Sequence, residues 1–269
     1  MKIYTRGVSP IIHDTDVNFT ATNICTANGA SVDVVQQDSS SKVIDFYFKR
    51  LLSTVTLSEN AVEDAYSVTL TAGHGVQAGE YLSFLEDGFA TQVKVLNVNT
   101  NIITIDSPMD YEYSTNSLVR RTSINMAVDG SSTPVVFNIV PYEANKWHIN
   151  TINLCIQDNV EMDTAKFGGM TALSKGIVIR RKDGISHNIC NVKTNGEFQV
   201  RGFETQYQTK APSGTYGLHL TKRFNGQSGN GSVILLDGET NDELQIIIQD
   251  DLTALSMFVA TVQGHYVID

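Results

Sequence analysis

The sequence is poor in cysteine and proline and contains no long apolar run. Its three cysteines, Cys25, Cys155 and Cys190, form an odd and widely spaced set. A disulfide scaffold or a zinc site normally needs paired short spacings, so we expect three reduced thiols in a protein made in a cytosol. No window approaches the roughly eighteen apolar residues of a membrane span, and the N-terminus lacks an apolar signal core. We therefore expect a soluble, unsecreted chain.

Basic residues are also scarce. The chain has 19 Lys and Arg against 29 Asp and Glu, which gives a formal net charge of -10. Such a charge repels phosphate backbones and anionic membrane surfaces at long range, which argues against sequence-specific nucleic-acid binding and against membrane binding. Hydrophobic residues make up 41% and charged residues 18% of the chain. This balance is typical of a folded globular protein of 269 residues.

The dominant pattern is an alternation of apolar and polar residues, as in Gln92–Val98 and Asn101–Asp106. This period of two predicts half-buried strands. The other predicted strands are Val43–Phe48, Ser67–Leu70, Glu80–Leu85, Pro134–Ile139, His148–Ile156, Gly176–Arg181, Ser186–Val192, Tyr216–Thr221, Ser232–Leu236, Leu244–Gln249 and Met257–Val262. No long amphipathic helix is predicted, and a single helical turn is expected at Asp250–Leu255, capped by Asp.

These strands predict an all-β protein with a small β-barrel-like module and a larger, jelly-roll-like antiparallel β-sandwich. We place an N-terminal arm and first strand, which can complete the sandwich, at residues 1–52. The small module follows at 53–124 and the sandwich at 125–269. Ser123–Pro134 is interpreted as a polar connector, and the small and polar residues of Thr15–Ser31 predict an extended arm that becomes ordered on a neighbour.

The most conspicuous candidate site is the glycine-rich stretch AGHGVQAGEY, residues 72–81. Its Gly73, Gly75 and Gly79 are spaced one residue too far for a dinucleotide fingerprint, and no helix follows to direct its N-terminus at a phosphate. We interpret the stretch as a turn between two strands, with glycine supplying positive φ angles. His74 is then a loop-tip histidine and not a catalytic base.

Three acidic clusters are candidate metal or catalytic sites. Asp158–Asp163 could ligate calcium but does not fit an EF-hand loop, so a solvated loop is favoured. The cluster around Gly238, which consists of Asp237, Glu239, Asp242 and Glu243, is interpreted as a hairpin turn. Asp250 and Asp251 would point to opposite faces of a strand, so they would not flank one glycoside, and capping is the simpler role.

No nucleophile has a catalytic context, and no histidine pair has zinc-protease spacing. The six histidines are His13, His74, His148, His187, His219 and His265. Trp147 is expected to pack at a sandwich rim and not to stack on a sugar. Arg180–Gly184, the one basic cluster, is predicted to be a hairpin whose tip could meet an acidic neighbour. We expect no enzyme activity, no catalytic or cofactor-binding residue and no metal.

Several segments together resemble a recurrent structural protein of tailed bacteriophages. The segments are Phe167–Leu173, Gly176–Arg180, Lys193–Gly196, Phe224–Gln227, Ile247–Leu252 and Gly264–His265. Gly73–Glu80 and Ile102–Tyr111 are similar to small β modules of phage virion proteins. The resemblance covers most of residues 66–267.

This resemblance implies a virion part similar to collar, neck or tail-adaptor proteins at the head–tail junction. It further implies a ring of identical copies that contacts portal, connector, tail or fibre proteins, made in the host cytoplasm. Transient passage of DNA through such a ring is compatible with the acidic charge. One alternative is a carbohydrate- or receptor-binding module of a fibre or baseplate that uses Tyr111, Tyr113 and Tyr142. Another is a glycan-degrading enzyme with two of the carboxylates.

Overall fold

The computed structural model describes residues 2–4, 11–13, 30–35, 43–86, 89–139, 141, 146–162, 169, 173–193, 204–208, 214–224 and 234–267. Within them the strands are β1 (Lys2–Tyr4), β2 (Ile11–His13), β3 (Ala30–Val35), β4 (Val43–Thr56), β5 (Ser67–Thr69), β6 (Tyr81–Glu86), β7 (Phe89–Asn99), β8 (Ile102–Ile105), β9 (Leu118–Ser123), β10 (Val135–Ile139), β11 (Lys146–Asp158), β12 (Ile177–Lys182), β13 (Ser186–Val192), β14 (Glu204–Gln208), β15 (Tyr216–Arg223), β16 (Ile234–Asp237), β17 (Glu243–Ile248) and β18 (Met257–Val267).

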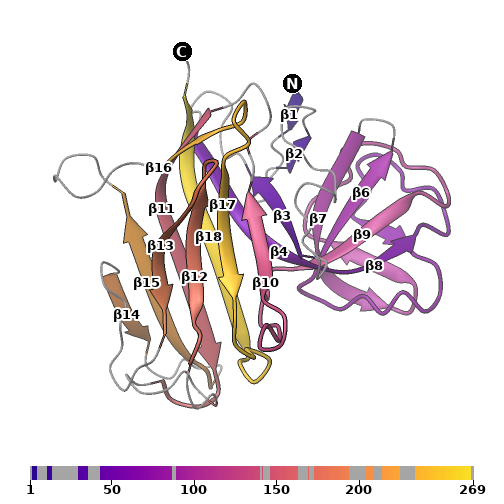
Figure 1. Ribbon diagram of the computed structural model, residues 1–269. Coiled ribbons are helices and arrows are strands. Elements are labelled where there is room, and N and C mark those ends of the chain that lie inside the picture. The colour runs from indigo at the N-terminus through magenta and orange to yellow at the C-terminus, as the bar shows by residue number, and fades with distance from the viewer. Residues whose placement is uncertain are drawn as a thin grey trace.

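The predicted all-β sandwich architecture is confirmed. A four-stranded sheet in the order β10-β17-β12-β13 packs against a much larger antiparallel sheet whose strands β14, β15, β11, β18 and β4 form the second layer (Figure 1). The central strand β11 has the burial alternation expected of a half-buried strand, with Trp147, Ile149 and Ile152 among its buried residues. These inward side chains pack between the layers, and the alternate residues face outward.

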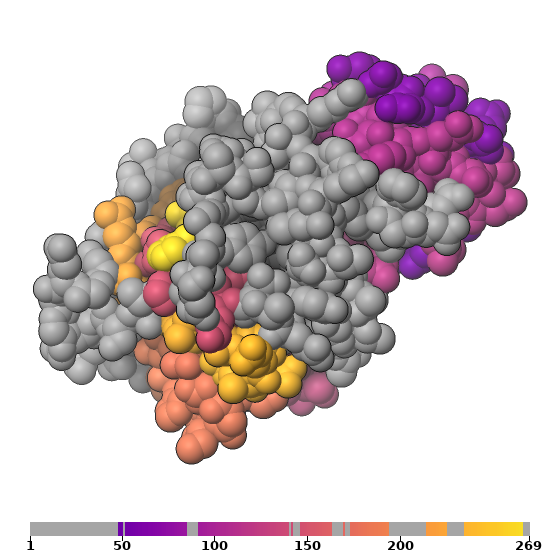
Figure 2. Space-filling view, turned by 90° about the horizontal axis from the view of Figure 1, so that it is seen from above, coloured from indigo at the N-terminus to yellow at the C-terminus, as the bar shows by residue number. Residues whose placement is uncertain are grey.

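Buried apolar residues gather in two clusters. One lies between the two layers and draws on residues 48 and 126–262. The other draws on residues 57–119 and includes Phe84 and Tyr113, whose rings are 5.6 Å apart. In Figure 2 the second group, coloured indigo to magenta, forms one end of the molecule, and the segments coloured orange to yellow lie at the other. The division at 52/53 and 124/125 itself stays a prediction.

Strand β4 runs through both groups. Its first part pairs with β18 through Val43–Tyr47, and its second part pairs with β9 through Arg50–Thr56. The register of β4 against β9 shifts between Leu51 and Ser53, which is a β-bulge. The predicted boundary at 52/53 therefore falls inside one continuous strand, at its bulge.

The remaining strands of the large sheet follow β4 in the order β9-β6-β7-β8-β5. The end of β4 and the strand β5 meet through two backbone hydrogen bonds, from Ser58 N to Thr69 O at 3.0 Å and from Thr71 N to Thr56 O at 2.9 Å. These bonds bring the two ends of the row together, as a barrel-like closure requires. That closure and the N-terminal arm both stay predictions, because most of the arm lies outside the described residues.

Sequence periodicity missed five strands, β1, β2, β3, β9 and β14. β9 has the sequence LVRRTS, in which Arg120 and Arg121 occupy consecutive positions, so apolar alternation is absent. It is nevertheless paired on both sides, with β4 and with β6. β14 has the sequence ETQYQ, in which Tyr207 is the single apolar residue, so it has no apolar alternation. Tertiary pairing, not local pattern, decides such strands.

One local prediction is wrong and one is partly wrong. Ser123–Pro134 is not a free connector: Met126 is fully buried and its N–H donates to Phe258 O at 2.7 Å. Of the capped helical turn predicted at Asp250–Leu255, the cap and a turn are present but the turn is not helical, and Asp251 itself is in an extended bridge with Asp129. A turn closed by Leu255 N and Leu252 O at 3.0 Å follows, and Asp251 caps it by accepting a hydrogen bond from Thr253 N at 2.9 Å.

Candidate functional site

The glycine-rich stretch is a turn, as predicted. Gly73, Gly75 and Gly79 have φ angles of 80°, 65° and 90°, and the stretch joins β5 to β6. His74 is no free loop tip, however. Its Nδ1 accepts a hydrogen bond from Val76 N at 2.9 Å, which leaves Nε2 to donate to Thr100 O at 3.0 Å. Both ring nitrogens are therefore engaged in holding the turn.

The acid at the end of this stretch forms a largely buried ion pair. Glu80, 8% exposed, accepts hydrogen bonds from Arg121 Nε at 2.5 Å and from Arg121 Nη2 at 2.7 Å. The paired carboxylate raises the pKa of Arg121 above its usual value. Gln77 N also donates to Glu80, at 3.1 Å. Glu80 therefore anchors the turn to β9.

Replacing Gly79 with Val should lower the stability of the small group by about 2 kcal/mol. Nothing lies within 4 Å of a Cβ at this position, so the positive φ alone opposes the side chain. Hydrogen exchange of β6 amides measures the effect, with the neighbouring Ala78→Val as the matched control. Equal protection in the two variants would show that the conformation of Gly79 is not what the turn needs.

Asp158 and Asp250 are loop clamps. Asp158, 4% exposed, accepts hydrogen bonds from Asn159 N at 2.7 Å and Gly169 N at 2.5 Å, so the solvated-loop interpretation is wrong for this residue. Asp250, 8% exposed, accepts from Gly176 N at 2.6 Å and from Ser174 Oγ at 2.9 Å. Asn159–Glu161 are exposed, and Asp163 lies outside the described residues. Asp251 is exposed whereas Asp250 is buried.

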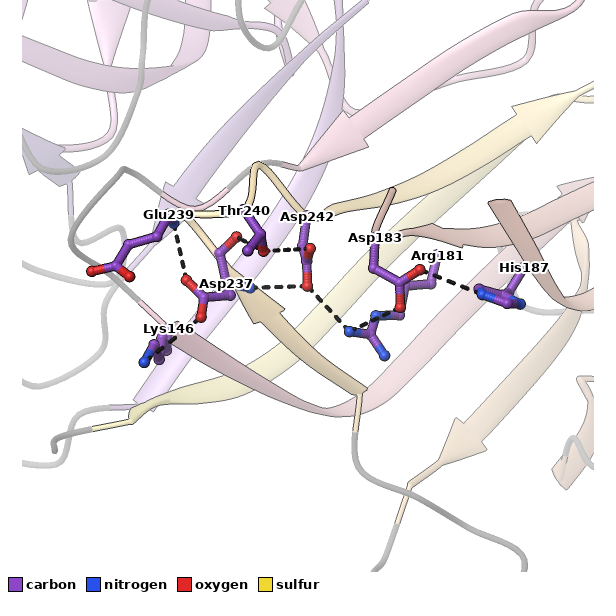
Figure 3. A network of polar contacts seen from close by, with 8 residues as sticks. All are labelled: Lys146, Arg181, Asp183, His187, Asp237, Glu239, Thr240 and Asp242. Atoms are coloured by element: carbon purple, nitrogen blue, oxygen red, sulfur yellow. Dashed lines mark hydrogen bonds and ion pairs between the residues drawn. The ribbon is translucent and has the colours of Figure 1, made fainter. Parts of the chain in front are cut away.

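The acidic cluster around Gly238 forms a tight turn, but not a hairpin. Asp242 N donates to Asp237 O at 3.0 Å, yet β16 pairs with β11 in one sheet and β17 lies in the other. Asp242, 3% exposed, accepts hydrogen bonds from Thr240 Oγ1 at 2.7 Å and Asp237 N at 3.3 Å (Figure 3). The Asp242 carboxylate therefore holds the turn through which the chain passes from one sheet to the other.

The basic hairpin meets this acidic turn within the same chain. Arg181 Nη2 lies 3.1 Å from Asp242 and 3.2 Å from Asp183 (Figure 3). Lys182 Nζ lies 2.9 Å from Glu243. The β12–β13 hairpin is confirmed, with a positive φ of 84° at Gly184. Within the chain, Arg181 and Lys182 therefore pair with the β16–β17 turn, and a contact of the hairpin tip with an acidic neighbour in an assembly stays a prediction.

The aromatic candidates are mostly buried. Trp147 is fully buried in the sandwich core, which confirms packing over sugar stacking. Tyr113 is also fully buried, and its hydroxyl donates to Thr91 Oγ1 at 2.9 Å. Tyr111 packs partly against the same core, and Tyr142 lies outside the described residues. Neither Tyr113 nor Trp147 can stack on a ligand.

One open cavity of about 400 Å³ lies beside β10. Its walls carry both charge signs, Arg50 and Asp129, with the hydroxyls of Ser132 and Thr133. It suits polar groups, but it holds no nucleophile or general base in a catalytic arrangement.

On the outward side of β15, β11 and β18, three consecutive cross-strand rows carry no charged side chain; the next row contains Arg223, opposite Thr151, and Glu204 of β14 lies opposite Thr221. Residues that lie opposite one another on neighbouring strands point to the same face of the sheet. The strand register therefore defines these three rows of side chains across β15, β11 and β18. Most of their side chains are half-buried, and none is Asp, Glu, Lys or Arg. We call this set the charge-free face: Asn153, Thr221 and Thr261; Cys155, His219 and Val259; Gln157, Gly217 and Met257.

Strand register also gathers chemistry on this side of the sheet that sequence spacing could not reveal. Cys155 Sγ lies 3.8 Å from His219 Nε2, and burial raises the pKa of the thiol. Beyond the face, His148 Nδ1 lies 3.3 Å from His265 Nε2. The thiol of Cys190 lies in the other sheet, and burial raises its pKa to about 11. Cys25 lies outside the described residues, as do the side chain of His13 and its contacts.

No protein-family model matches the sequence, and no curated protein matches it. Within the described residues, no three His, Cys, Asp or Glu side chains gather as a metal site. The same part of the chain has no helix long and apolar enough to cross a membrane.

Proposed function

We propose that this chain is a structural subunit of a tailed-bacteriophage particle, which assembles with copies of itself into a ring at the head–tail junction or in the tail. The resemblance of its strand and turn segments to phage virion proteins supports this proposal. Rings form when one surface of a subunit meets a different surface of the next. The subunit is made in the host cytoplasm and meets portal, connector, tail or fibre proteins in the particle.

The charge-free face is the observation that carries the assembly proposal. An exposed sheet face of a soluble protein ordinarily bears charged side chains, whereas the centres of protein interfaces are depleted in them. Copies that each have a formal net charge of -10 repel one another. The electrostatic repulsion between two copies is smallest where their contacting surfaces carry no charge. The Asn, Gln and Thr side chains of the charge-free face can then form hydrogen bonds across the contact.

The buried carboxylates favour a structural role over glycan hydrolysis. Each of Glu80, Asp158, Asp242 and Asp250 accepts hydrogen bonds from backbone N–H groups of a turn or loop. Each therefore has a task in holding the fold. Tyr113 cannot serve the glycan-binding alternative, since its ring is buried.

Thr261→Glu should weaken self-association about 100-fold or more, because an unpaired carboxylate desolvated in an interface costs several kcal/mol. Size-exclusion chromatography with light scattering measures the oligomeric mass of parent and variant. The matched control is Thr104→Glu, which places the same charge on an exposed strand position of β8 in the small group. The parent and the control should remain oligomeric and the Thr261→Glu variant should dissociate.

Two results would contradict the proposal. A parent protein that is monomeric at every concentration argues against self-assembly. Absence of the chain from purified particles, tested by mass spectrometry, argues against a virion part. If the Thr261→Glu and Thr104→Glu variants form equally stable oligomers, the chain assembles but its interface lies outside the charge-free face.

A further inference from the structure

His148 and His265 occupy opposite positions on the neighbouring strands β11 and β18. The nitrogens His148 Nδ1 and His265 Nε2 are 3.3 Å apart, and the two rings are nearly perpendicular, at 88°. The two residues are 117 positions apart in the chain. They meet only because the antiparallel register of β11 and β18 sets them side by side.

We propose that His148 and His265 together bind one divalent transition-metal ion of the Zn²⁺ class. Neutral imidazole is a common ligand of such ions, with a metal–nitrogen distance of about 2.0–2.1 Å. Two nitrogens at that distance in tetrahedral geometry are about 3.3–3.4 Å apart. The observed spacing of 3.3 Å already matches this separation. Metal binding would replace the hydrogen bond between the two rings and would require both rings to rotate so that their lone pairs point at one ion.

Asn150 is the positioning residue of this pair. Its Nδ2 lies 3.2 Å from His265 Nδ1, so the amide can donate to that nitrogen while His265 Nε2–H donates to His148. When Nε2 binds a metal, the proton of His265 moves to Nδ1. A half-turn of the amide then offers Asn150 Oδ1 as the acceptor. This reproduces the second-layer acceptor that fixes most metal-binding histidines.

The surroundings leave the pair available to a cation. Lys146, two residues before His148, has its ammonium 3.6 Å from Asp237, which offsets its charge. The register partners on the outer sides are Leu235 on β16 and Val43 on β4, so neither adds a charge. Burial, followed by the neighbouring His265, lowers the pKa of His148. Water or oxygens of a second molecule would fill the remaining metal positions.

Cys155 and His219 are the nearest rival pair, with 3.8 Å between Sγ and Nε2. A thiol must lose its proton to bind a metal, and burial raises the pKa of Cys155. The two-histidine pair needs no such deprotonation. The test therefore has to separate these two pairs.

Calorimetric titration of chelator-treated protein with ZnCl₂ at pH 7.5 tests the proposal. One ion per chain should bind, and His148→Ala and His265→Ala should each weaken binding about tenfold or more, while Asn150→Asp tightens it about tenfold. His187→Ala, at a side chain 60% exposed, and His219→Ala are the controls and should bind as the parent does.

Circular dichroism of each metal-free variant verifies that its fold is retained. The absence of saturable Zn²⁺ binding by the parent would overturn the proposal. Binding that is lost in His219→Ala but kept in His148→Ala would overturn it as well, and would assign the ion to Cys155 and His219. A protein that does not self-associate but still binds Zn²⁺ would contradict only the proposed assembly and not the metal site.

Discussion

Arg121→Met is expected to lower the stability of the small group by about 3–5 kcal/mol. The substitution removes both donors of the bidentate contact and leaves the Glu80 carboxylate, 8% exposed, without its cation. It also releases the glycine turn from β9, because Glu80 holds Gln77 N of that turn. Loss of an ion-pair partner from a poorly solvated site is among the costliest single changes in a protein.

Hydrogen exchange of β6 and β9 amides measures this effect, and Trp147 fluorescence in urea reports the sandwich core separately. The double variant Glu80→Gln with Arg121→Met should be more stable than Arg121→Met alone, because no unpaired charge remains. Arg121→Lys should fall between parent and Arg121→Met, since an ammonium cannot form the two-pronged contact. A single Arg121→Met variant within 1 kcal/mol of the parent would show that the pair adds little, as solvent-exposed pairs do.

Gly264→Ala is expected to destabilise the sandwich by about 3 kcal/mol. A Cβ at this position would lie 2.2 Å from His148 O and 3.3 Å from Ile149 Cα. These are backbone atoms of β11, so no side-chain rotation can relieve the overlap, and β18 would have to move away from β11. The close approach lies next to the register shift between Ile149 and Thr151.

The matched control for Gly264→Ala is Gly184→Ala in the β12–β13 hairpin of the sandwich, where nothing lies within 4 Å of the added Cβ and only the φ of 84° opposes it. That change should cost about 1 kcal/mol. Urea unfolding followed by Trp147 fluorescence should therefore shift far more for Gly264→Ala. Equal shifts would mean that β18 and β11 are not in close contact at this point. Zn²⁺ binding should also decrease in Gly264→Ala, because the displaced strand carries His265.

The alternation of apolar and polar residues was enough to predict most strands of the sandwich. Ser186–Val192 was predicted with the bounds that β13 has, and Pro134–Ile139 differs from β10 by one residue. Glycine at positions 73, 75 and 79 predicted the positive φ angles that the turn adopts. Such features depend on residues close in sequence, so local pattern specifies them.

The acidic residues were harder to interpret, because their roles depend on distant partners. Asp250 clamps the loop at Ser174–Gly176, and Asp158 accepts a hydrogen bond from Gly169. From sequence, both looked like solvated or capping carboxylates. The sequence does not distinguish a buried carboxylate from an exposed one. Only the tertiary structure shows which backbone amides donate to each carboxylate.

The sequence by itself determined an acidic all-β chain, because composition and a period of two are properties of neighbouring residues. The tertiary structure alone decided that β4 joins two cores, that β16 and β17 enter different layers, and that His148 meets His265. It also decided which outward positions form a continuous uncharged surface. The physical reason is that strand pairing joins residues more than a hundred positions apart, and the register that aligns them is set by packing of the whole sheet.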